Sequence, residues 1–416
     1  MRTTLKRDQA VIRAIHILGL GIAASLLGDG TLMTVLPQAS FSSQLALTLN
    51  MVAWALAVNR IVRLAFNPMA GRLLQRFPRR AVLIPAMGLG GISTLLCSLG
   101  GLGWVMAGRA LWGLAWAGLW VGGTTVVLDL SNRNNRGRLN GLFQMWFFIG
   151  VGSSSFLGAW LADLFGLRAA LVISAALMML ICLMWAFLLP ETGDHRTQHD
   201  DPPKRFWRDT VVLKAVAVAS PPMFINRFLF AGMIAVTVIL WLETFIGEGV
   251  QMMGVFIPLA TLAGAFAASR TLISMFSTPY TGRLSDRMGR RWPAMAAVLV
   301  MGAMGCGLMS LRFFPLAVCG LLLSSVTSGG IQTLLSAWIG DTVLQERQEN
   351  VIGALFSVGD VGSAIGPIAG LTWIQHYSIP ALYQLSAIIL ILGAGYSIII
   401  SSKSAAAMRD SAVPRS

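Results

Sequence analysis

Charged side chains are scarce in this sequence. Only 12% of its 416 residues are Asp, Glu, Lys or Arg, whereas soluble domains carry about a quarter. Hydrophobic residues make up 56%, and the mean hydropathy is +0.72. Such a composition excludes a water-soluble globular protein. Apolar runs of about 20 residues, the length that crosses a ~30 Å hydrocarbon core, recur along the chain and leave no separate aqueous domain.

Residues that support enzyme chemistry are also few. The four cysteines lie in or beside apolar runs without metal-ligand spacing, and of the four histidines only His195 and His199 are close together. No phosphate-binding glycine loop with a following lysine is present, so nucleotide-driven pumping is not indicated. The stretch "GSSSF" at 152–156 lacks the glycine that completes a nucleophile elbow. We therefore expect no enzyme, no cofactor and no metal site.

The apolar runs predict an all-α membrane protein with twelve transmembrane helices. Pro221 and Pro222 would end or kink a helix, so we expect the seventh span to begin after them, with residues 205–219 in the membrane interface. The first run carries Asp29 and is expected to be an uncleaved helix. The predicted spans are 14–36, 45–68, 81–100, 104–128, 139–163, 168–189, 223–246, 251–279, 292–311, 314–340, 351–375 and 379–401.

Positive charge divides the loops into two sets. The outer loops 37–44 and 99–103 carry no positive charge, so the positive-inside rule places both termini in the cytoplasm. We expect the protein in the cytoplasmic (inner) membrane of the cell. This topology and anionic lipid headgroups explain the net charge of +14, so no nucleic-acid partner is expected. The arginines of the inner loops are Arg72, Arg76, Arg79, Arg80, Arg133, Arg136, Arg138, Arg283, Arg287, Arg290 and Arg291.

The chain repeats itself. "GRLLQRFPRR" at 71–80 and "GRLSDRMGRR" at 282–291 share six of ten residues at an offset of 211, and Asp129 matches Asp341 at an offset of 212. Two six-helix halves are predicted, 1–189 and 214–403, with a cytoplasmic linker at 190–213 and a cytoplasmic tail at 404–416. Many secondary transporters are built from such halves around a midplane site, although a duplicated bundle without transport is the alternative.

The two decapeptides resemble the signature that follows helices 2 and 8 in the major facilitator superfamily. The resemblance implies twelve helices in two pseudo-symmetric halves, alternating access, and a latch at the cytoplasmic ends. The first copy has Gln75 in place of the acid and Pro78 in place of the second glycine. The gate residues that the resemblance implies are Gly71, Arg72, Arg76, Arg80, Gly282, Asp286, Arg287, Gly289 and Arg290.

Further motifs are similar to the drug and metabolite:proton antiporter branch of that family. "RALWGLAWAG" at 109–118 resembles the helix-4 motif, with Arg109 and Gly113. The antiporter motif is degraded in "GVGSSSFLG" at 150–158 and intact in "GSAIGPIAG" at 362–370. Small residues at this spacing let helices approach closely, so packing alone can explain both copies. The packing residues are Gly150, Gly158, Gly362, Gly366, Pro367 and Gly370.

Several charged residues lie deep in the predicted spans. Arg60 lies 11 residues before Gly71, or roughly 16 Å, near the bilayer centre. A charge facing lipid there costs ~3 kcal/mol, so these side chains are expected to line a cavity or to pair. The set contains four arginines and two aspartates, so two positive charges remain after pairing, and these favour an anionic substrate. The charged residues are Asp29, Arg60, Arg63, Arg109, Arg270 and Asp360.

Two roles divide this set. Arg60, Arg63 and Arg270, with Asn59 beside them, are the hypothesised substrate site; the alternative is that they bond to helix carbonyls or to Asp360. Asp29, Arg109 and Asp360 are assigned to proton coupling. The resemblance supports this for Arg109, because the family's helix-4 arginine is associated with the proton site. A static salt bridge between Asp29 on helix 1 and Arg109 on helix 4 is an equally good alternative.

Trp112, Trp116 and Trp120 recur every four residues on helix 4. Trp116 is hypothesised to stack a flat or lipophilic substrate, whereas tryptophans in membrane helices more often pack against neighbouring helices.

The sequence thus predicts a secondary transporter of a small anionic or amphiphilic organic solute, with protons as coupling ion and the lipid bilayer and a small-molecule substrate as partners. Efflux by proton exchange is the first choice, and a monomer is expected. Proton-coupled uptake of an organic anion is the alternative. A membrane sensor without transport and a membrane enzyme are more distant ones.

Overall fold

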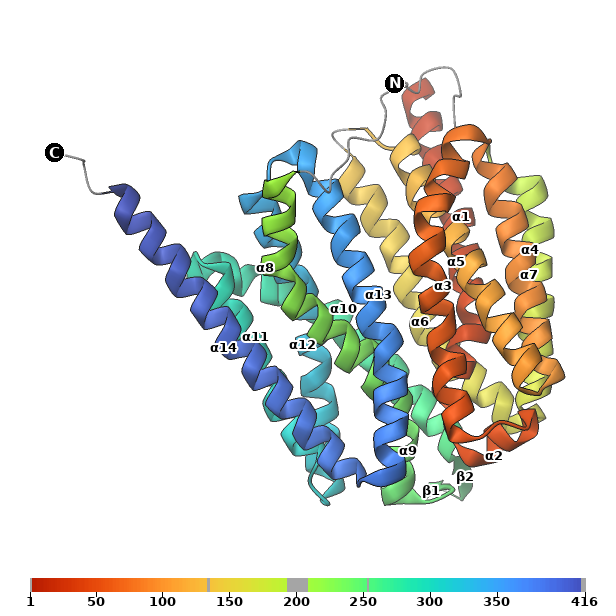
Figure 1. Cartoon of the computed structure of the whole chain (residues 1–416). Helices are drawn as coiled ribbons and strands as arrows, with labels where there is room; N and C mark the ends of the chain where they lie inside the picture. Colours follow the sequence, from red (N-terminus) through yellow and green to blue (C-terminus); the bar gives the residue numbers. More distant parts are fainter. Residues whose placement is uncertain (1, 133–134, 193–208, 253, 413–416) are drawn as a thin grey trace. The chain divides into compact units, whose positions relative to one another are not determined.

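The computed structural model of the chain describes residues 2–132, 135–192, 209–252 and 254–412 (Figure 1). Within these ranges, twelve helices are long and apolar enough to cross a membrane, which confirms the predicted fold class. His195, His199 and most of the predicted linker 190–213 lie outside the described residues, as does the end of the predicted tail 404–416.

The described elements follow one another along the chain. In chain order they are α1 (Arg2–Val35), α2 (Ala39–Ser42), η1 (Ser43–Leu45), α3 (Leu49–Arg76), α4 (Arg79–Leu99), α5 (Leu102–Leu130), α6 (Arg136–Phe165), α7 (Leu167–Leu188), α8 (Thr210–Asn226), the π-helical segment η3 (Arg227–Met233), α9 (Ile234–Ile246), β1 (Gly249–Met252), β2 (Val255–Pro258), α10 (Leu259–Met288), α11 (Arg291–Met309), α12 (Phe314–Thr342), α13 (Gln345–His376) and α14 (Ile379–Ala412).

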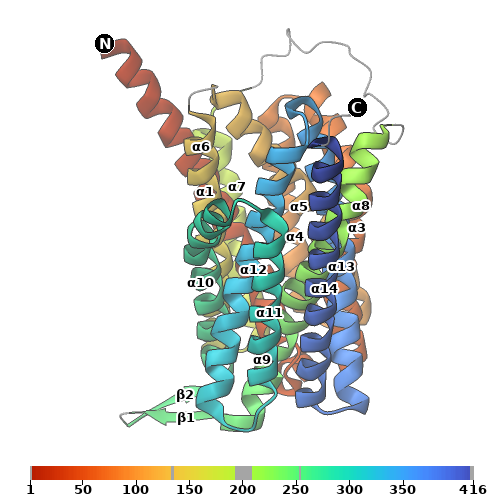
Figure 2. The same cartoon turned by 90° about the vertical axis from the view of Figure 1, so that its left-hand side faces the viewer.

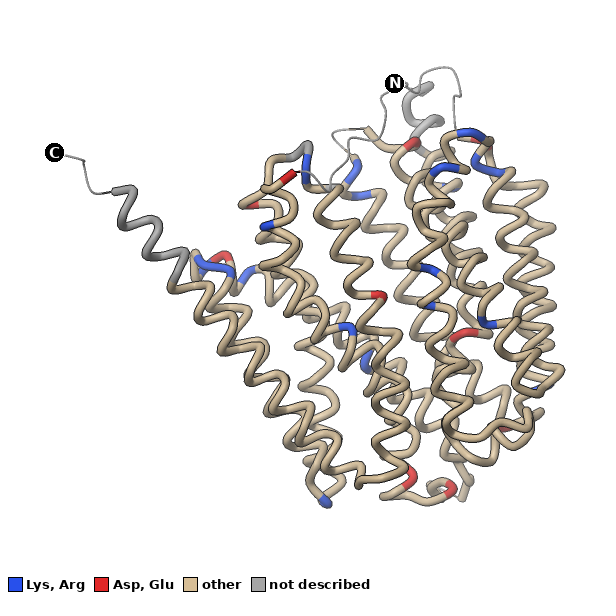
Figure 3. The backbone as a smooth tube through the Cα atoms, viewed as in Figure 1, with Lys and Arg blue, Asp and Glu red and all other residues tan. Residues whose placement is uncertain are grey.

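The chain divides into two compact units. The first unit comprises residues 1–201 and 235–268, and the second comprises 202–234 and 269–416. Each consists of helices packed side by side, and in each the Lys and Arg residues gather toward one end of the helices while a few lie part-way along them (Figure 3). The division into halves at 189 and 214 stays a prediction, because the unit boundaries fall inside the segments α9 and α10 rather than only in the linker.

In the first unit, α1 packs on α6 and α7, while α5 packs on α3 and α4. A core of buried apolar side chains joins α1, α4, α5, α6 and α7, and Leu18, Trp112, Phe143 and Trp185 belong to it. Apolar side chains removed from contact with lipid and water pack as densely here as in other protein interiors, which fixes the positions of the helices that carry the polar side chains described below.

In the second unit, α11 packs on α12 and α14, and α13 packs on α8 and η3. The seventh span differs from the prediction. It runs through Pro221 and Pro222, from Thr210 to Ile246, so residues 210–219 are helical rather than a separate interfacial stretch. The prediction was wrong because neighbouring groups compensate for the prolines. Pro222 has no N–H for the carbonyl of Val218, and the hydroxyl of Tyr396 donates to that carbonyl at 3.0 Å instead.

The predicted eighth span, 251–279, is wrong at its start. Residues 249–252 and 255–258 form an antiparallel hairpin, with Met252 opposite Val255, and α10 begins only at Leu259 (Figure 2). Hydropathy does not separate this hairpin from the helix, because its strand residues are apolar. The signal lies in Gly254, whose φ of +81° suits the turn that reverses the chain.

The start of α10 is held by α6 in the first unit. The carboxylate of Asp163 accepts from the backbone N–H of Thr261 at 2.7 Å and from its hydroxyl, which satisfies one of the free donors at the helix N-terminus. Three residues later the two helices touch, since a Cβ on Gly264 would lie 2.5 Å from the carbonyl oxygen of Ser155.

Candidate functional site: intramembrane charges and the ion pairs at the helix ends

An ion pair holds the end of α4 in the first unit. Arg79, 4% exposed, donates its Nε to Asp129 on α5 at 2.9 Å and Nη1 to the carbonyl of Leu74. The carboxylate of Glu191 accepts from the backbone N–H groups of Arg79 and Arg80, at 2.9 and 3.1 Å. Because Pro78 at the N-cap provides no side-chain acceptor, Glu191 caps α4 from a position more than 110 residues away.

The second unit repeats this pair. Arg291, the first residue of α11, donates its Nε to Asp341 on α12 at 2.7 Å, and its Nη1 bonds to Asp286 and to the hydroxyl of Ser285. The arginine and the aspartate are 50 residues apart in both units, at an offset of 212. The two pairs therefore occupy equivalent places in the repeat.

The predicted gate residues are mostly helical. Gly71, Arg72 and Arg76 lie on α3, Arg80 lies in the first turn of α4, and Arg80 donates to the carbonyl of Ala186. In the other copy, Gly282, Asp286 and Arg287 lie on α10, Gly289 follows it with φ +62°, and Arg290 is the N-cap of α11.

Sequence reasoning did not assign Arg79, Asp129, Glu191 or Asp341 to this site. A signal was present, since Asp129 and Asp341 match within the repeat.

Asp29 and Arg109 meet inside the first unit. Nη1 of Arg109, on α5, lies 2.5 Å from Oδ1 of Asp29 on α1, and Nε donates to the carbonyl of Ala55 on α3 at 3.1 Å. The arginine is 1% exposed, and its Nη2 is buried without a partner among the described residues. Gly113 permits this geometry, because a Cβ there would lie 2.4 Å from the carbonyl oxygen of Asn59. One guanidinium thus joins three helices and retains an unused buried donor.

The predicted substrate residues of α3 lie beside this pair. Nη1 of Arg60 donates to the carbonyl of Leu56 at 2.9 Å and contacts the sulfur of Met33 at 3.6 Å. Met33 is one helical turn beyond Asp29 on α1, so Arg60 and Arg109 approach the same stretch of α1. Asn59 is 3% exposed and its Oδ1 has no partner in the described part of the chain, whereas Arg63 is half-buried.

Trp116 is surrounded by aromatic rings in the first unit. It stacks on Trp120 with centroids 5.7 Å apart and meets Trp112 at 5.6 Å and Phe147 at 6.2 Å, and it is 7% exposed. This arrangement agrees with the alternative in which Trp112, Trp116 and Trp120 pack against neighbouring side chains.

The glycines of the degraded motif lie against α1. A Cβ on Gly150 would lie 2.6 Å from Cα of Ala23, and one on Gly158 would lie 3.0 Å from Cα of Thr31. Glycine at these two positions therefore sets the distance between α6 and α1, and any side chain there would push the helices apart.

The intact motif on α13 lies against the π-helical segment in the second unit. A Cβ on Gly362 would lie 2.9 Å from the carbonyl oxygen of Phe224, and one on Gly366 would lie 2.5 Å from that of Phe228. Pro367 and Gly370 are buried in the same helix. Asp360, half-buried on α13, accepts at its backbone carbonyl from the hydroxyl of Ser363.

Arg270 also bonds to the π-helical segment. Its Nη2 donates to the carbonyl of Phe230 at 3.2 Å, and its Nε is buried without a partner among the described residues. This contact corresponds to the alternative in which an arginine bonds to a helix carbonyl. A further arginine, Arg227, begins the π-helical segment and donates Nη2 to Oε1 of Gln332 at 3.4 Å.

Sequence reasoning missed Arg227. The predicted start of the span at 223 placed it near a helix end, whereas α8 begins at Thr210, 17 residues or roughly 26 Å earlier.

The sequence matches the Major Facilitator Superfamily over residues 18–274 and 260–407. The chain belongs to this superfamily. As a member of it, with twelve candidate spans in its described residues, the chain is a multi-pass membrane transporter of small molecules.

Relatives and solved structures agree with this assignment. The chain is 24% identical over 348 residues, 80% of its length and 79% of the relative, to the Multidrug resistance protein MdtG of Dickeya zeae, and 30% identical over 110 residues to the MFS-type transporter gkaD of Penicillium citrinum, of which the match spans 18%. A bacterial homologue of the human lysosomal transporter Spinster, in an inward-facing and occupied conformation, shares the fold with a TM-score of 0.72 and 12% identity over 95% of this chain and 97% of that one.

Proposed function

We propose that this transporter exports a small anionic or amphiphilic organic solute across the cytoplasmic membrane in exchange for protons. The observation that carries the proposal is the Asp29–Arg109 pair, an ion pair between α1 and α5 in the interior of the first unit. A carboxylate paired inside a membrane protein marks an ion or proton pathway by default. The multidrug resistance relatives support the direction of export.

The chemistry proceeds through a change of partners. Arg109 has an unused buried Nη2, and Asn59 nearby has an unused buried Oδ1. A substrate group that bonds to Arg109 takes the place of the proton at Asp29, so that substrate and proton occupy the site in turn, as exchange requires. Proton binding and substrate binding are coupled in this way, and Arg60 and Arg63 supply further positive charge on the adjacent helix.

The topology and assembly are parts of the same proposal. Both termini lie in the cytoplasm, because the arginines gather at the helix ends that would face it. The protein works as a monomer whose two halves alternate access to the site. Asp360 assists proton transfer in the second unit.

The surplus arginines equally suit uptake of an organic anion together with protons. The direction of proton flux relative to substrate flux separates export by exchange from this uptake.

The test uses protein reconstituted in liposomes that contain a pH-sensitive dye, with 2-naphthoate as the anionic probe and ethidium as the cationic one. We expect 2-naphthoate to move protons in the opposite direction in wild type. Asp29→Asn is expected to retain exchange of labelled against unlabelled probe while losing accumulation driven by the pH gradient, by at least ~10-fold.

Glu248→Gln is the matched control, since Glu248 is an exposed carboxylate next to the β-hairpin. It is expected to behave as wild type. Full accumulation by Asp29→Asn would dismiss the coupling role and leave the pair as a static tie between helices. Proton movement in the same direction as the probe would favour uptake.

A further inference from the structure

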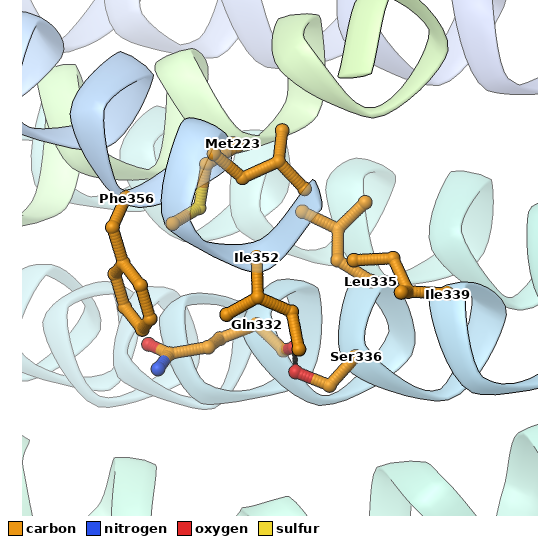
Figure 4. Close-up of a pocket in the computed structure, with 8 residues that line it drawn as sticks. Met223, Gln332, Leu335, Ser336, Ile339, Ile352 and Phe356 are labelled. Atoms are coloured by element: carbon orange, nitrogen blue, oxygen red, sulfur yellow. Dashed lines mark hydrogen bonds between the residues drawn. The ribbon is translucent and has the colours of Figure 1, made fainter. Parts of the chain in front are cut away.

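A pocket lies inside the second unit, between α8, α12 and α13 (Figure 4). Its walls are apolar: Met223 comes from α8, Leu335 and Ile339 from α12, and Ile352 and Phe356 from α13. The polar residues of the lining are Gln332 and Ser336, both exposed on α12, and the side chain of Gln332 extends toward Phe356 in Figure 4. Such a surface offers apolar contacts next to polar side chains.

A guanidinium meets the polar side of this pocket. Nη2 of Arg227 donates to Oε1 of Gln332 at 3.4 Å. Gly359 on α13 makes room for both the arginine and the wall, because a Cβ there would lie 2.9 Å from Cγ of Arg227 and 3.2 Å from Cε of Met223. The arginine and the apolar wall thus converge at one glycine. A guanidinium carries five N–H donors in a planar fork, which matches a carboxylate.

The backbone at Arg227 has an uncommon form. The π-helical segment begins at this residue and continues to Met233 in the middle of a membrane-spanning helix. Segments of this kind are rare and concentrate at functional sites. Here it is held from two sides, by Arg270 at the carbonyl of Phe230 and by Gly366 against Phe228. Arg270 bonds to the segment itself, and Arg227 bonds from the segment to Gln332 on α12.

We propose that Arg227, with Gln332, binds an anionic group of the transported solute, and that the apolar side chains beside them contact its apolar body. The substrate class is therefore an organic anion that carries its carboxylate on an aromatic or branched apolar frame. This inference rests on the proposed export function and names the part of the second unit that selects the substrate.

The test measures binding without transport. Calorimetry on the detergent-purified full chain compares 2-naphthoate with 2-naphthylmethylammonium, which has the same ring system and the opposite charge. We expect wild type to bind the anion and to ignore the cation. Arg227→Gln is expected to weaken binding of 2-naphthoate at least 10-fold, about 1.4 kcal/mol, and Arg227→Lys less, because an ammonium keeps the charge without the fork.

A steric variant tests the pocket independently of the arginine. Gly359→Ala, which pushes on Arg227 and Met223, is expected to weaken 2-naphthoate binding to a similar degree. Gly353→Ala is the matched control on the same helix, since a Cβ there meets nothing within 4 Å, and its affinity should equal that of wild type. If Arg227→Gln does not fold, the site is tested by comparing the 2-naphthoate affinity of Gly359→Ala with that of Gly353→Ala.

The outcomes separate the site from the transport proposal. Wild-type affinity in both Arg227→Gln and Gly359→Ala, equal binding of the cation, or no binding of 2-naphthoate overturns the site. Binding that depends on Arg227 without flux in liposomes keeps the site and rejects export of this probe. Flux that continues unchanged in Arg227→Gln keeps the transporter and rejects the site.

Discussion

The ion pairs at the ends of α4 and α11 have the same spacing and different surroundings. Arg79 and Asp129 expose 5% and 21% of their side chains, whereas Arg291 and Asp341 expose 21% and 51%. The repeat has kept the geometry of the pair while the environment has diverged. Since the interaction of two charges depends steeply on their contact with water, equivalent residues are expected to contribute unequally to stability.

The source of the second acid also differs. In the second unit Asp286, on the helix that precedes the pair, bonds to Arg291. The first unit has Gln75 where the motif has this aspartate, and its additional carboxylate comes from Glu191, which bonds to the backbone of α4. The motif's lost acid is therefore replaced by a different contact: a helix cap instead of a side-chain ion pair.

The largest expected effect is that of Asp129→Asn, which leaves the buried guanidinium of Arg79 without its counter-charge. We expect a loss of about 3 kcal/mol, the low end of the range for a broken buried pair, and a fall of about 3 °C in the unfolding midpoint of detergent-purified protein. Asp341→Asn, the matched change in the second unit, should cost no more than about 1 kcal/mol. Equal losses would show that burial does not distinguish the two pairs.

An intermediate effect is expected for Glu191→Ala. Removal of this carboxylate frees the first two N–H groups of α4, and loss of a helix cap costs about 1 kcal/mol. Hydrogen exchange at the start of α4 should accelerate, while the start of α11, whose N-cap Arg290 makes no side-chain cap bond, should stay as it is. Unchanged exchange at α4 would mean that Glu191 does not cap the helix in solution.

The smallest effect is expected when the motif's acid is exchanged between the units. Gln75→Asp should change stability by less than about 0.5 kcal/mol, because Arg79 already bonds to Asp129 and Leu74. Asp286→Asn should also cost less than about 1 kcal/mol, since 63% of the Asp286 side chain is exposed. Thermal unfolding of both variants measures the change in stability. Strong stabilisation by Gln75→Asp would show that the contacts of Asp129 and Glu191 do not replace the motif's aspartate.

Hydropathy predicted the number and order of the spans because the composition of a helix in lipid is tightly constrained. It was wrong where apolar residues form a hairpin instead of a helix, and where a distant side chain supplies the hydrogen bond that a proline removes. The hairpin at 249–258 is as apolar as a span, and α8 continues through Pro221 and Pro222 with help from Tyr396. The hairpin has a local signal in Gly254, which hydropathy does not register, whereas Tyr396 lies 178 positions from Val218 and cannot be recognised as its partner from the local sequence.

The candidate site was predictable in its charges and only partly in its contacts. The depth of Asp29 and Arg109 indicated a pair, and the structure brings the two together. The carbonyl that Arg270 bonds to belongs to the π-helical segment, which no local pattern indicated. Arg227 was hidden by the error in the start of its helix, because an arginine near a helix end is ordinary while the same residue at mid-helix is costly.

The bond from Tyr396 to Val218 has a consequence for synthesis. The two residues are 178 positions apart, so at a translation rate of 5–20 residues per second the proline-containing helix waits roughly 10–40 s for its partner. During that interval, the carbonyl of Val218 lacks the donor that the finished chain supplies. The bond that compensates for Pro222 in the seventh helix therefore forms only after the last helix has been made.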